Sequence, residues 1–273
     1  SLMPGDNIYK TFPNLYTIRG TTHRDVMGWI SSLDHMRSFH PKYVFPSHTK
    51  PIIGSETISD TFILYRDAIQ FVHDQTVRLM NQGYYPDQII ELVDLPEAIK
   101  KSPFLNEFYG TVRWSVKSIY NGYLGWFNGN PAELDPLSRK DEAQKFADLI
   151  GGEEALFLAL TNAVNQNEMQ WALELSDRLI ALDFSISEVE SLRRQALLYL
   201  GVRSSNPNKR NYILSSALEL SDGFISFPET ARTSEGVKEI SIDTIFSILS
   251  VRLNPEKVIN KNMNVCFYFL SGL

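Results

Sequence analysis

Apolar residues recur every three or four positions through the middle of this chain, which is the period of an amphipathic helix. The pattern predicts a mainly α protein, with a helical bundle over residues 58–223. The longest stripe predicts one helix that ends near Gly83 and buries Phe62, Tyr65, Ile69, Val72, Thr76 and Leu79. A second helix is expected to open at Pro86, because proline suits the first helical turn.

A corner rich in aromatic residues and glycine follows a further predicted helix. That helix is indicated by apolar residues at helical spacing, namely Val112, Val116, Ile119, Tyr120 and Tyr123. Asn128-Gly129 is a strong turn signal, and residues 130–133 have the cap, the proline and the acid of a short helical turn. The residues alone favour a structural corner whose aromatic side chains belong to the core.

After this corner, the remaining helices are expected to pack as one bundle. Ser138 can cap the first of them, and Ser187 with Glu190 predicts a capping box for a later helix that ends near Gly201. A polar break precedes a last helix over residues 210–220. No period is sustained over three units, so a repeat array is not expected.

The first 57 residues predict a small α/β layer. Residues 14–20 alternate as in a short strand or an extended loop, residues 25–39 have helical spacing, and residues 43–45 predict a buried strand. His48 follows that strand on a loop. Functional side chains commonly lie on such loops, so this strand end is a candidate site.

The last segment, residues 224–273, predicts the beginning of a separate mixed unit. Residues 245–249 suggest a short helix, and residues 265–269 suggest a buried strand with Cys266 in the core. One helix and one strand cannot bury their own apolar faces, so we expect an incomplete domain. A single cysteine excludes an internal disulfide and a cysteine-rich zinc site.

The composition argues against one class of binding partner and does not determine the cellular compartment. A net charge of -6 argues against nucleic acid as the main partner, because phosphate neutralisation needs clustered lysine and arginine. No apolar run approaches the roughly 20 residues of a transmembrane helix. The first residues do not resemble a signal peptide. The protein is therefore expected in the cytoplasm, or in the periplasm or medium if an export signal has been left out.

Residues 123–132, Tyr-Leu-Gly-Trp-Phe-Asn-Gly-Asn-Pro-Ala, resemble a signature of the alkyl sulfatases, enzymes that hydrolyse dodecyl sulfate and related detergents. Further matches occur in the same order at residues 15–25, 48–54 and 206–220. The resemblance implies three parts. These are the closing edge of an α/β metallo-β-lactamase-like domain (1–57), a helical dimerisation domain (58–223), and the start of an α+β domain like sterol carrier protein (224–273). It also implies a homodimer and an alkyl sulfate substrate.

The resemblance further implies hydrolysis by a water that two zinc ions activate. His48 stands where the family places its last metal-binding histidine, and Asp6 stands where relatives have a zinc-binding glutamate. The family's His-x-His-x-Asp-His motif is absent, and no pair among the five histidines has the spacing of a zinc site. We therefore expect a chain truncated at its N-terminus, naturally or by cloning, and inactive or nearly so by itself.

Four residues are candidates for contacting the substrate. Arg19 and Arg24 flank a short loop, and a guanidinium fork can grip a sulfate group by paired hydrogen bonds. The alternative for Arg24 is a surface ion pair with Asp25. The resemblance implies that a tyrosine near the corner contacts substrate, which indicates Tyr120 or Tyr123. As core aromatics, both would need no such role.

Three classes of function thus remain open from the sequence. The first is a fragment of a sulfate-ester hydrolase. The second is a non-catalytic helical association module, in which Trp114, Trp126 and Trp171 serve packing or a homodimer interface. The third is a lipid- or detergent-binding module, suggested by the sterol-carrier-like residues 242–269.

Overall fold

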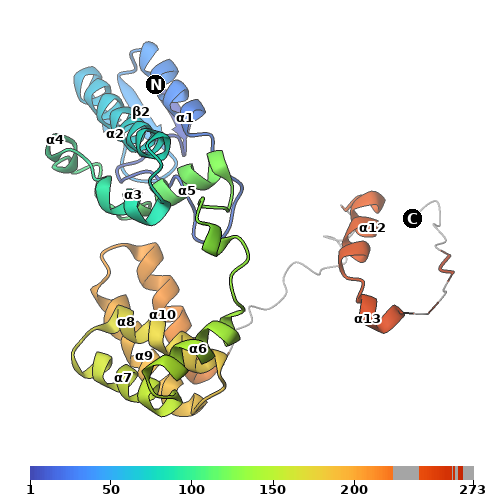
Figure 1. Cartoon of the computed structure of the whole chain (residues 1–273). Coiled ribbons are helices and arrows are strands. Elements are labelled where there is room, and N and C mark those ends of the chain that lie inside the picture. Colours follow the sequence, from blue (N-terminus) through green and yellow to red (C-terminus); the bar gives the residue numbers. More distant parts are fainter. Residues whose placement is uncertain (224–239, 260, 262–263, 267–273) are drawn as a thin grey trace. The chain divides into compact units, whose positions relative to one another are not determined.

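The computed structural model describes residues 1–223, 240–259, 261 and 264–266 (Figure 1). It divides into two units, Ser1–Gly223 and Phe224–Leu273. The first unit contains β1 (Leu2–Gly5), α1 (Val26–Ser38), β2 (Tyr43–Pro46), β3 (Ile52–Ile53), α2 (Ser55–Asn81), α3 (Pro86–Leu92), α4 (Glu97–Lys100), α5 (Val112–Leu124), η1 (Pro131–Glu133), α6 (Arg139–Ile150), α7 (Glu153–Asn165), α8 (Met169–Ala181), α9 (Ile186–Arg203) and α10 (Pro207–Asp222). The described part of the second unit contains α12 (Ile242–Val251) and α13 (Pro255–Val258).

A three-stranded sheet opens the first unit. β1 pairs with β2 in parallel, with Leu2 opposite Val44, and β2 pairs with β3 antiparallel. Two parallel neighbours need a crossover, and α1 provides it. The α1 helix begins where predicted, because the Asp25 carboxylate accepts a hydrogen bond from the Gly28 amide at 2.8 Å. Both parallel strands therefore end at the same edge of the sheet.

The α2 helix lies at the centre of the first core and packs against α1 and α5 (Figure 1). All six residues of its predicted apolar stripe are buried: Phe62, Tyr65, Ile69, Val72, Thr76 and Leu79. Residues 14–20, predicted as a strand or an extended loop, form a loop. The apolar spacing thus correctly predicted a mainly helical fold with a small sheet at its beginning.

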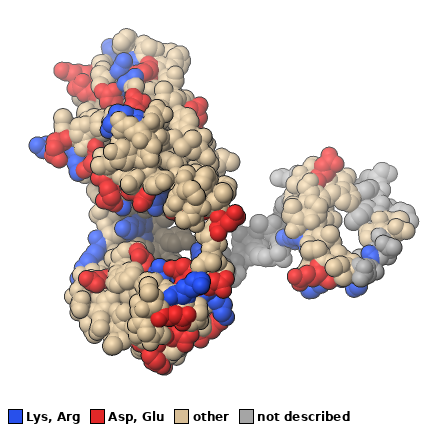
Figure 2. All heavy atoms as spheres, in the orientation of Figure 1, with Lys and Arg blue, Asp and Glu red and all other residues tan. Residues whose placement is uncertain are grey.

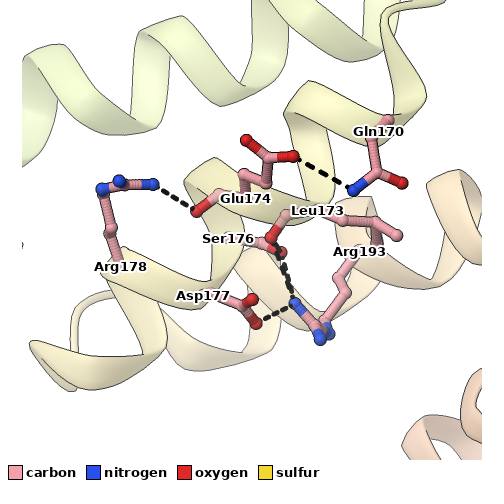
Figure 3. A network of polar contacts seen from close by, with 7 residues as sticks. All are labelled: Gln170, Leu173, Glu174, Ser176, Asp177, Arg178 and Arg193. Carbon is pink, nitrogen blue, oxygen red and sulfur yellow. Dashed lines mark hydrogen bonds and ion pairs between the residues drawn. The ribbon is translucent and has the colours of Figure 1, made fainter. Parts of the chain in front are cut away.

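The helices α6 to α10 pack against their sequence neighbours around a second core. Leu156, Leu160, Leu175, Leu179 and Val189 are among its buried residues. Arg193 reaches from α9 to α8 and donates to the Leu173 carbonyl, Ser176 Oγ and Asp177 Oδ1, at 3.3, 2.7 and 2.6 Å (Figure 3). This arginine ties the exposed edges of two helices together.

Two local predictions were wrong. The α9 helix starts after Ser185, which has a φ of 42° and makes no side-chain cap, and the Ser187 hydroxyl bonds Glu188 instead of forming a capping box with Glu190. Cys266, expected in a core, is exposed, and residues 264–266 have no regular structure. The rest of the strand predicted at 265–269 lies outside the described residues. The short helix expected at 245–249 is present as part of α12.

Charged side chains of both signs are mixed over the face drawn in Figure 2. None of the helices in the described ranges combines the length and the apolar character that crossing a membrane requires.

Candidate functional site

Asp6 and His48 lie side by side at the shared edge of the parallel strands. Asp6 follows β1 directly, and His48 follows β2 after one residue. The Ser47 amide donates to the Gly5 carbonyl at 3.2 Å, which continues the strand pairing into the loops. As a result, His48 Nε2 lies 3.5 Å from Asp6 Oδ1, and both side chains are exposed, by 70% and 67%.

The loop that carries His48 is anchored to the chain just after Asp6. Thr49 adopts a left-handed conformation, with a φ of 72°. Its hydroxyl accepts a hydrogen bond from the Lys10 amide at 3.2 Å. This turn directs His48 back towards the end of β1, so His48 and Asp6 meet although they are 42 positions apart in the sequence.

The Asp6 and His48 pair offers an imidazole nitrogen and a carboxylate oxygen, which are both ordinary zinc ligands. A zinc ion takes at least three protein ligands in catalytic sites. Within the described residues, no group of three or more histidine, cysteine, aspartate or glutamate side chains is placed to hold a metal ion. The pair therefore fits part of a zinc shell, and its role as a ligand stays a prediction.

The two candidate arginines have different surroundings. Arg24 is partly buried and donates from Nη1 to the Asn14 carbonyl at 2.8 Å, while Asp25 is engaged at the start of α1. Arg19 is exposed and lines a cavity of about 270 Å³ between its own loop and α10. Arg24 thus holds the loop in place through its hydrogen bond to Asn14, and Arg19 is the arginine that lines the cavity.

The cavity beside Arg19 has an unusual polar wall. Asn14 Oδ1 and Thr17 Oγ1 are buried there and have no hydrogen-bond partner among the described residues. A buried polar atom without a hydrogen-bond partner costs free energy, so these two oxygens favour the binding of water or of another polar molecule in the cavity. A neighbouring hollow of about 350 Å³ shares Ile18 and Tyr212 with it and is lined largely by apolar and aromatic side chains.

Tyr120 and Tyr123, the candidate tyrosines, differ sharply in exposure. Tyr120 is only 4% exposed, and its hydroxyl donates to the Asn128 carbonyl at 3.0 Å. Burial raises the pKa of Tyr120, so it remains a neutral donor that fixes the corner. Tyr123 is 54% exposed, at the end of α5.

Two histidines surround Tyr123, and the sequence reasoning assigned neither to a site. His73, on α2, lies with Nε2 2.7 Å from the Tyr123 hydroxyl, and its Nδ1 lies 2.8 Å from Asp74 Oδ1. His23 packs against Gly122 so closely that a β-carbon there would lie 2.1 Å from its Cε1. His73 and Tyr123 are 50 positions apart, and His23 and Gly122 are 99 positions apart. Contacts over such distances in the sequence leave no local pattern that could have predicted them.

His23 brings the arginine loop and Tyr123 together. It lies between Arg19 and Arg24 in the sequence, and its ring centroid is 6.5 Å from that of Tyr123. The loop that carries both arginines therefore meets the end of α5 at Gly122. The roles of Asp6, His48, Arg19, Arg24, Tyr120 and Tyr123 stay predictions.

Comparison with known proteins gives a consistent result. A family model described as alkyl sulfatase dimerisation matches residues 85–223. A linear primary-alkylsulfatase of a Pseudomonas strain is 41% identical over 77% of this chain. An alkyl/aryl-sulfatase of Saccharomyces cerevisiae is 31% identical over 93% of it. This chain spans 40% of the length of each of these two relatives.

A solved structure shows the same fold. The stereoselective inverting sec-alkylsulfatase of a Pseudomonas species superposes with a TM-score of 0.86 at 26% sequence identity. The match covers 94% of this chain and 41% of that protein.

Proposed function

Because the chain belongs to the alkyl sulfatase family, we propose that it is part of an enzyme that hydrolyses alkyl sulfate esters. The observation that carries the proposal is the placement of Asp6 beside His48, with 3.5 Å between nitrogen and oxygen. Two side chains predicted as ligands from separate stretches of sequence are neighbours in space.

We assign the three segments as the sequence suggested. Residues 1–57 would be the closing edge of a metallo-β-lactamase-like domain, supported by the parallel strands that end at Asp6 and His48. Residues 58–223 would be the dimerisation helices, of which 85–223 match the family model. Residues 224–273 would begin a sterol-carrier-like domain. Apolar residues of α12 are largely exposed, among them Ile242, Leu249 and Val251. Their exposure supports a domain in which further residues cover this helix.

Asp6 and His48 would hold zinc together with ligands from outside this chain. A metal ion held there would supply Lewis-acid activation of a water for hydrolysis of the ester. The remaining work belongs to this chain's own residues. The exposed guanidinium of Arg19 would bind the sulfate oxygens, Arg24 would keep its loop in place through Asn14, and the Tyr123 hydroxyl would contact the same anionic group. Because two ligands hold zinc weakly, the chain by itself is expected to be inactive.

A chimeric enzyme tests this proposal. The corresponding part of the Pseudomonas linear primary-alkylsulfatase would be replaced by this chain, and zinc content and sulfate release from octyl sulfate would be measured. Asp6→Ala and His48→Ala should each lose zinc and on the order of 100-fold in activity, because each removes a ligand. Asp60→Ala and His35→Ala, at exposed positions, are the matched controls. Full zinc and activity in both ligand variants would refute the assignment.

The family match supports a homodimer as the assembled form. Several large apolar side chains within residues 85–223 are exposed, including Leu92, Trp126, Leu149, Leu158 and Val202. These side chains are available to be buried between two copies, and a contiguous apolar patch is what marks such an association surface.

A further inference from the structure

Asp74, His73 and Tyr123 form a chain of hydrogen bonds from α2 to α5. His73 Nδ1 lies 2.8 Å from Asp74 Oδ1, and His73 Nε2 lies 2.7 Å from the Tyr123 hydroxyl. The His73 residue is 8% exposed, whereas Tyr123 is 54% exposed. A nearly buried imidazole is thus bonded on one side to a carboxylate and on the other to the hydroxyl of a tyrosine that is more than half exposed.

The carboxylate decides where the imidazole carries its proton. An ionised aspartate only accepts hydrogen bonds, so His73 must donate to Asp74 from Nδ1. A neutral imidazole with its proton on Nδ1 has an unprotonated Nε2, which can only accept. The Tyr123 hydroxyl must then donate its hydrogen bond to Nε2, so its oxygen can only accept from any other group that approaches it.

Protonation of His73 reverses this direction. An imidazolium donates from both nitrogens, so Nε2 would donate to the Tyr123 oxygen. The phenolic proton would then be free to donate outwards. The oxygens of an anionic sulfate group can accept a hydrogen bond from that hydroxyl but are repelled by an outward lone pair. The direction of one hydrogen bond therefore decides whether Tyr123 attracts or repels an anion.

We propose that His73 and Asp74 are positioning residues that set the direction of the Tyr123 hydrogen bond. Asp74 fixes the Nδ1 proton of His73, and His73 turns the Tyr123 hydroxyl into an outward donor when it is doubly protonated. The assignment of Tyr123 as a contact for the sulfate group rests on the proposed function; the hydrogen-bond direction does not.

The groups that face the imidazole come from three elements. Asp74 belongs to α2 with His73, Tyr123 belongs to α5, and His23 of the arginine loop packs beside Tyr123 with ring centroids 6.5 Å apart. The rings of His73 and Tyr123 meet edge to face at 5.7 Å, so their relative orientation is also fixed by packing.

Nitrogen NMR of the whole 273-residue chain tests the proposal directly. The chain would be labelled at the histidine ring nitrogens, and the His73 signals would be assigned from a His73→Gln variant. At a pH where His73 is neutral, we expect its Nδ1 to be protonated and its Nε2 to be unprotonated. Asp74→Ala should shift the neutral ring towards the other tautomer, while Tyr123→Phe should retain the Nδ1 proton.

Exposed His35 is the control, because its tautomer should not change in either variant. A neutral His73 with its proton on Nε2, or a tautomer indifferent to Asp74→Ala, overturns the proposal. Circular dichroism of each variant separates these outcomes from unfolding. A simple packing role for His73 would not produce a tautomer that depends on Asp74.

Addition of inorganic sulfate separates this inference from the proposed function. If Tyr123 contacts sulfate as an outward donor, sulfate should raise the protonated fraction of His73 at a fixed pH, by reciprocal linkage. Tyr123→Phe should abolish that response. An equal response in the wild type and in Tyr123→Phe overturns the switch. No response in the wild type, together with the predicted tautomer, refutes Tyr123 as a sulfate contact and supports the positioning by Asp74.

Discussion

At the scale of single residues, the buried tyrosines make the stability of the first core depend on alkaline pH. Burial raises the pKa of Tyr65 well above 10.0, and the neighbouring Tyr9 and Asp6 raise it further. Burial likewise raises the pKa of Tyr9, whose ring meets that of Tyr65 edge to face at 5.9 Å. The native state thus holds these protons more tightly than the unfolded chain does.

The sign of the pH effect follows from this shift. Below the unfolded pKa of 10.0, Tyr65 is neutral in both states and its contribution to stability is complete. As the pH rises from there towards the native pKa, the unfolded chain loses the proton first, so stability falls. We expect Tyr65→Phe to raise the midpoint pH of alkaline unfolding, measured by circular dichroism and tyrosinate absorbance.

Tyr84 provides the matched control for this experiment. Its side chain is exposed, so Tyr84→Phe should leave the alkaline midpoint unchanged. An unchanged midpoint in Tyr65→Phe would contradict the pH argument, provided that the variant retains its stability at neutral pH. The phenyl ring fills the same space, so little packing is lost.

At the scale of helices, the contact between α9 and α10 depends on a glycine. Gly201 is buried near the end of α9, and a β-carbon there would lie 2.6 Å from Leu214 Cδ2 and 2.8 Å from its Cγ. In an exposed helix, replacement of glycine by alanine stabilises by about 1 kcal/mol. Here we expect Gly201→Ala to destabilise the chain instead, because overpacking typically costs about 1–3 kcal/mol.

Urea unfolding measures this effect in the chain. Gln195→Ala, at an exposed position of the same helix, is the control and should change stability by at most about 0.5 kcal/mol. If Gly201→Ala were more stable than the wild type, Leu214 would have to move away without cost. The close approach of the two helices would then not be specified by Gly201.

Elements with a local signal could be predicted from the sequence, and elements without one could not. The α2 stripe and the helical spacing over residues 25–39 depend on residues within a few turns of one another, so periodicity identified both helices. The capping box at Ser187 failed because Ser185, in a left-handed conformation, starts the helix earlier. A sequence pattern cannot reveal which of two nearby serines adopts that backbone.

The candidate site shows the same division. Asp6 and His48 each follow a strand, so they meet at one edge of the sheet because the two strands pair in parallel. The pairing of such short strands cannot be predicted from the sequence. The bond between His73 and Tyr123 joins two helices through tertiary packing alone. Tyr120 and Tyr123 are three residues apart on one helix, and only the packing of α5 decides that the first is buried and the second exposed.

At the scale of the whole molecule, we expect two copies of the chain to associate through apolar surface. Light scattering should give a mass of about twice 31.2 kDa at micromolar concentration. Each copy carries a net charge of -6, so the copies repel one another and salt screens that repulsion. Added salt should therefore tighten the dimer, whereas a dimer held by surface ion pairs would loosen.

Dilution is the control, because a true equilibrium shifts towards single chains as concentration falls. A single-chain mass at every concentration and salt level would contradict the homodimer, and dissociation by salt would contradict its apolar origin.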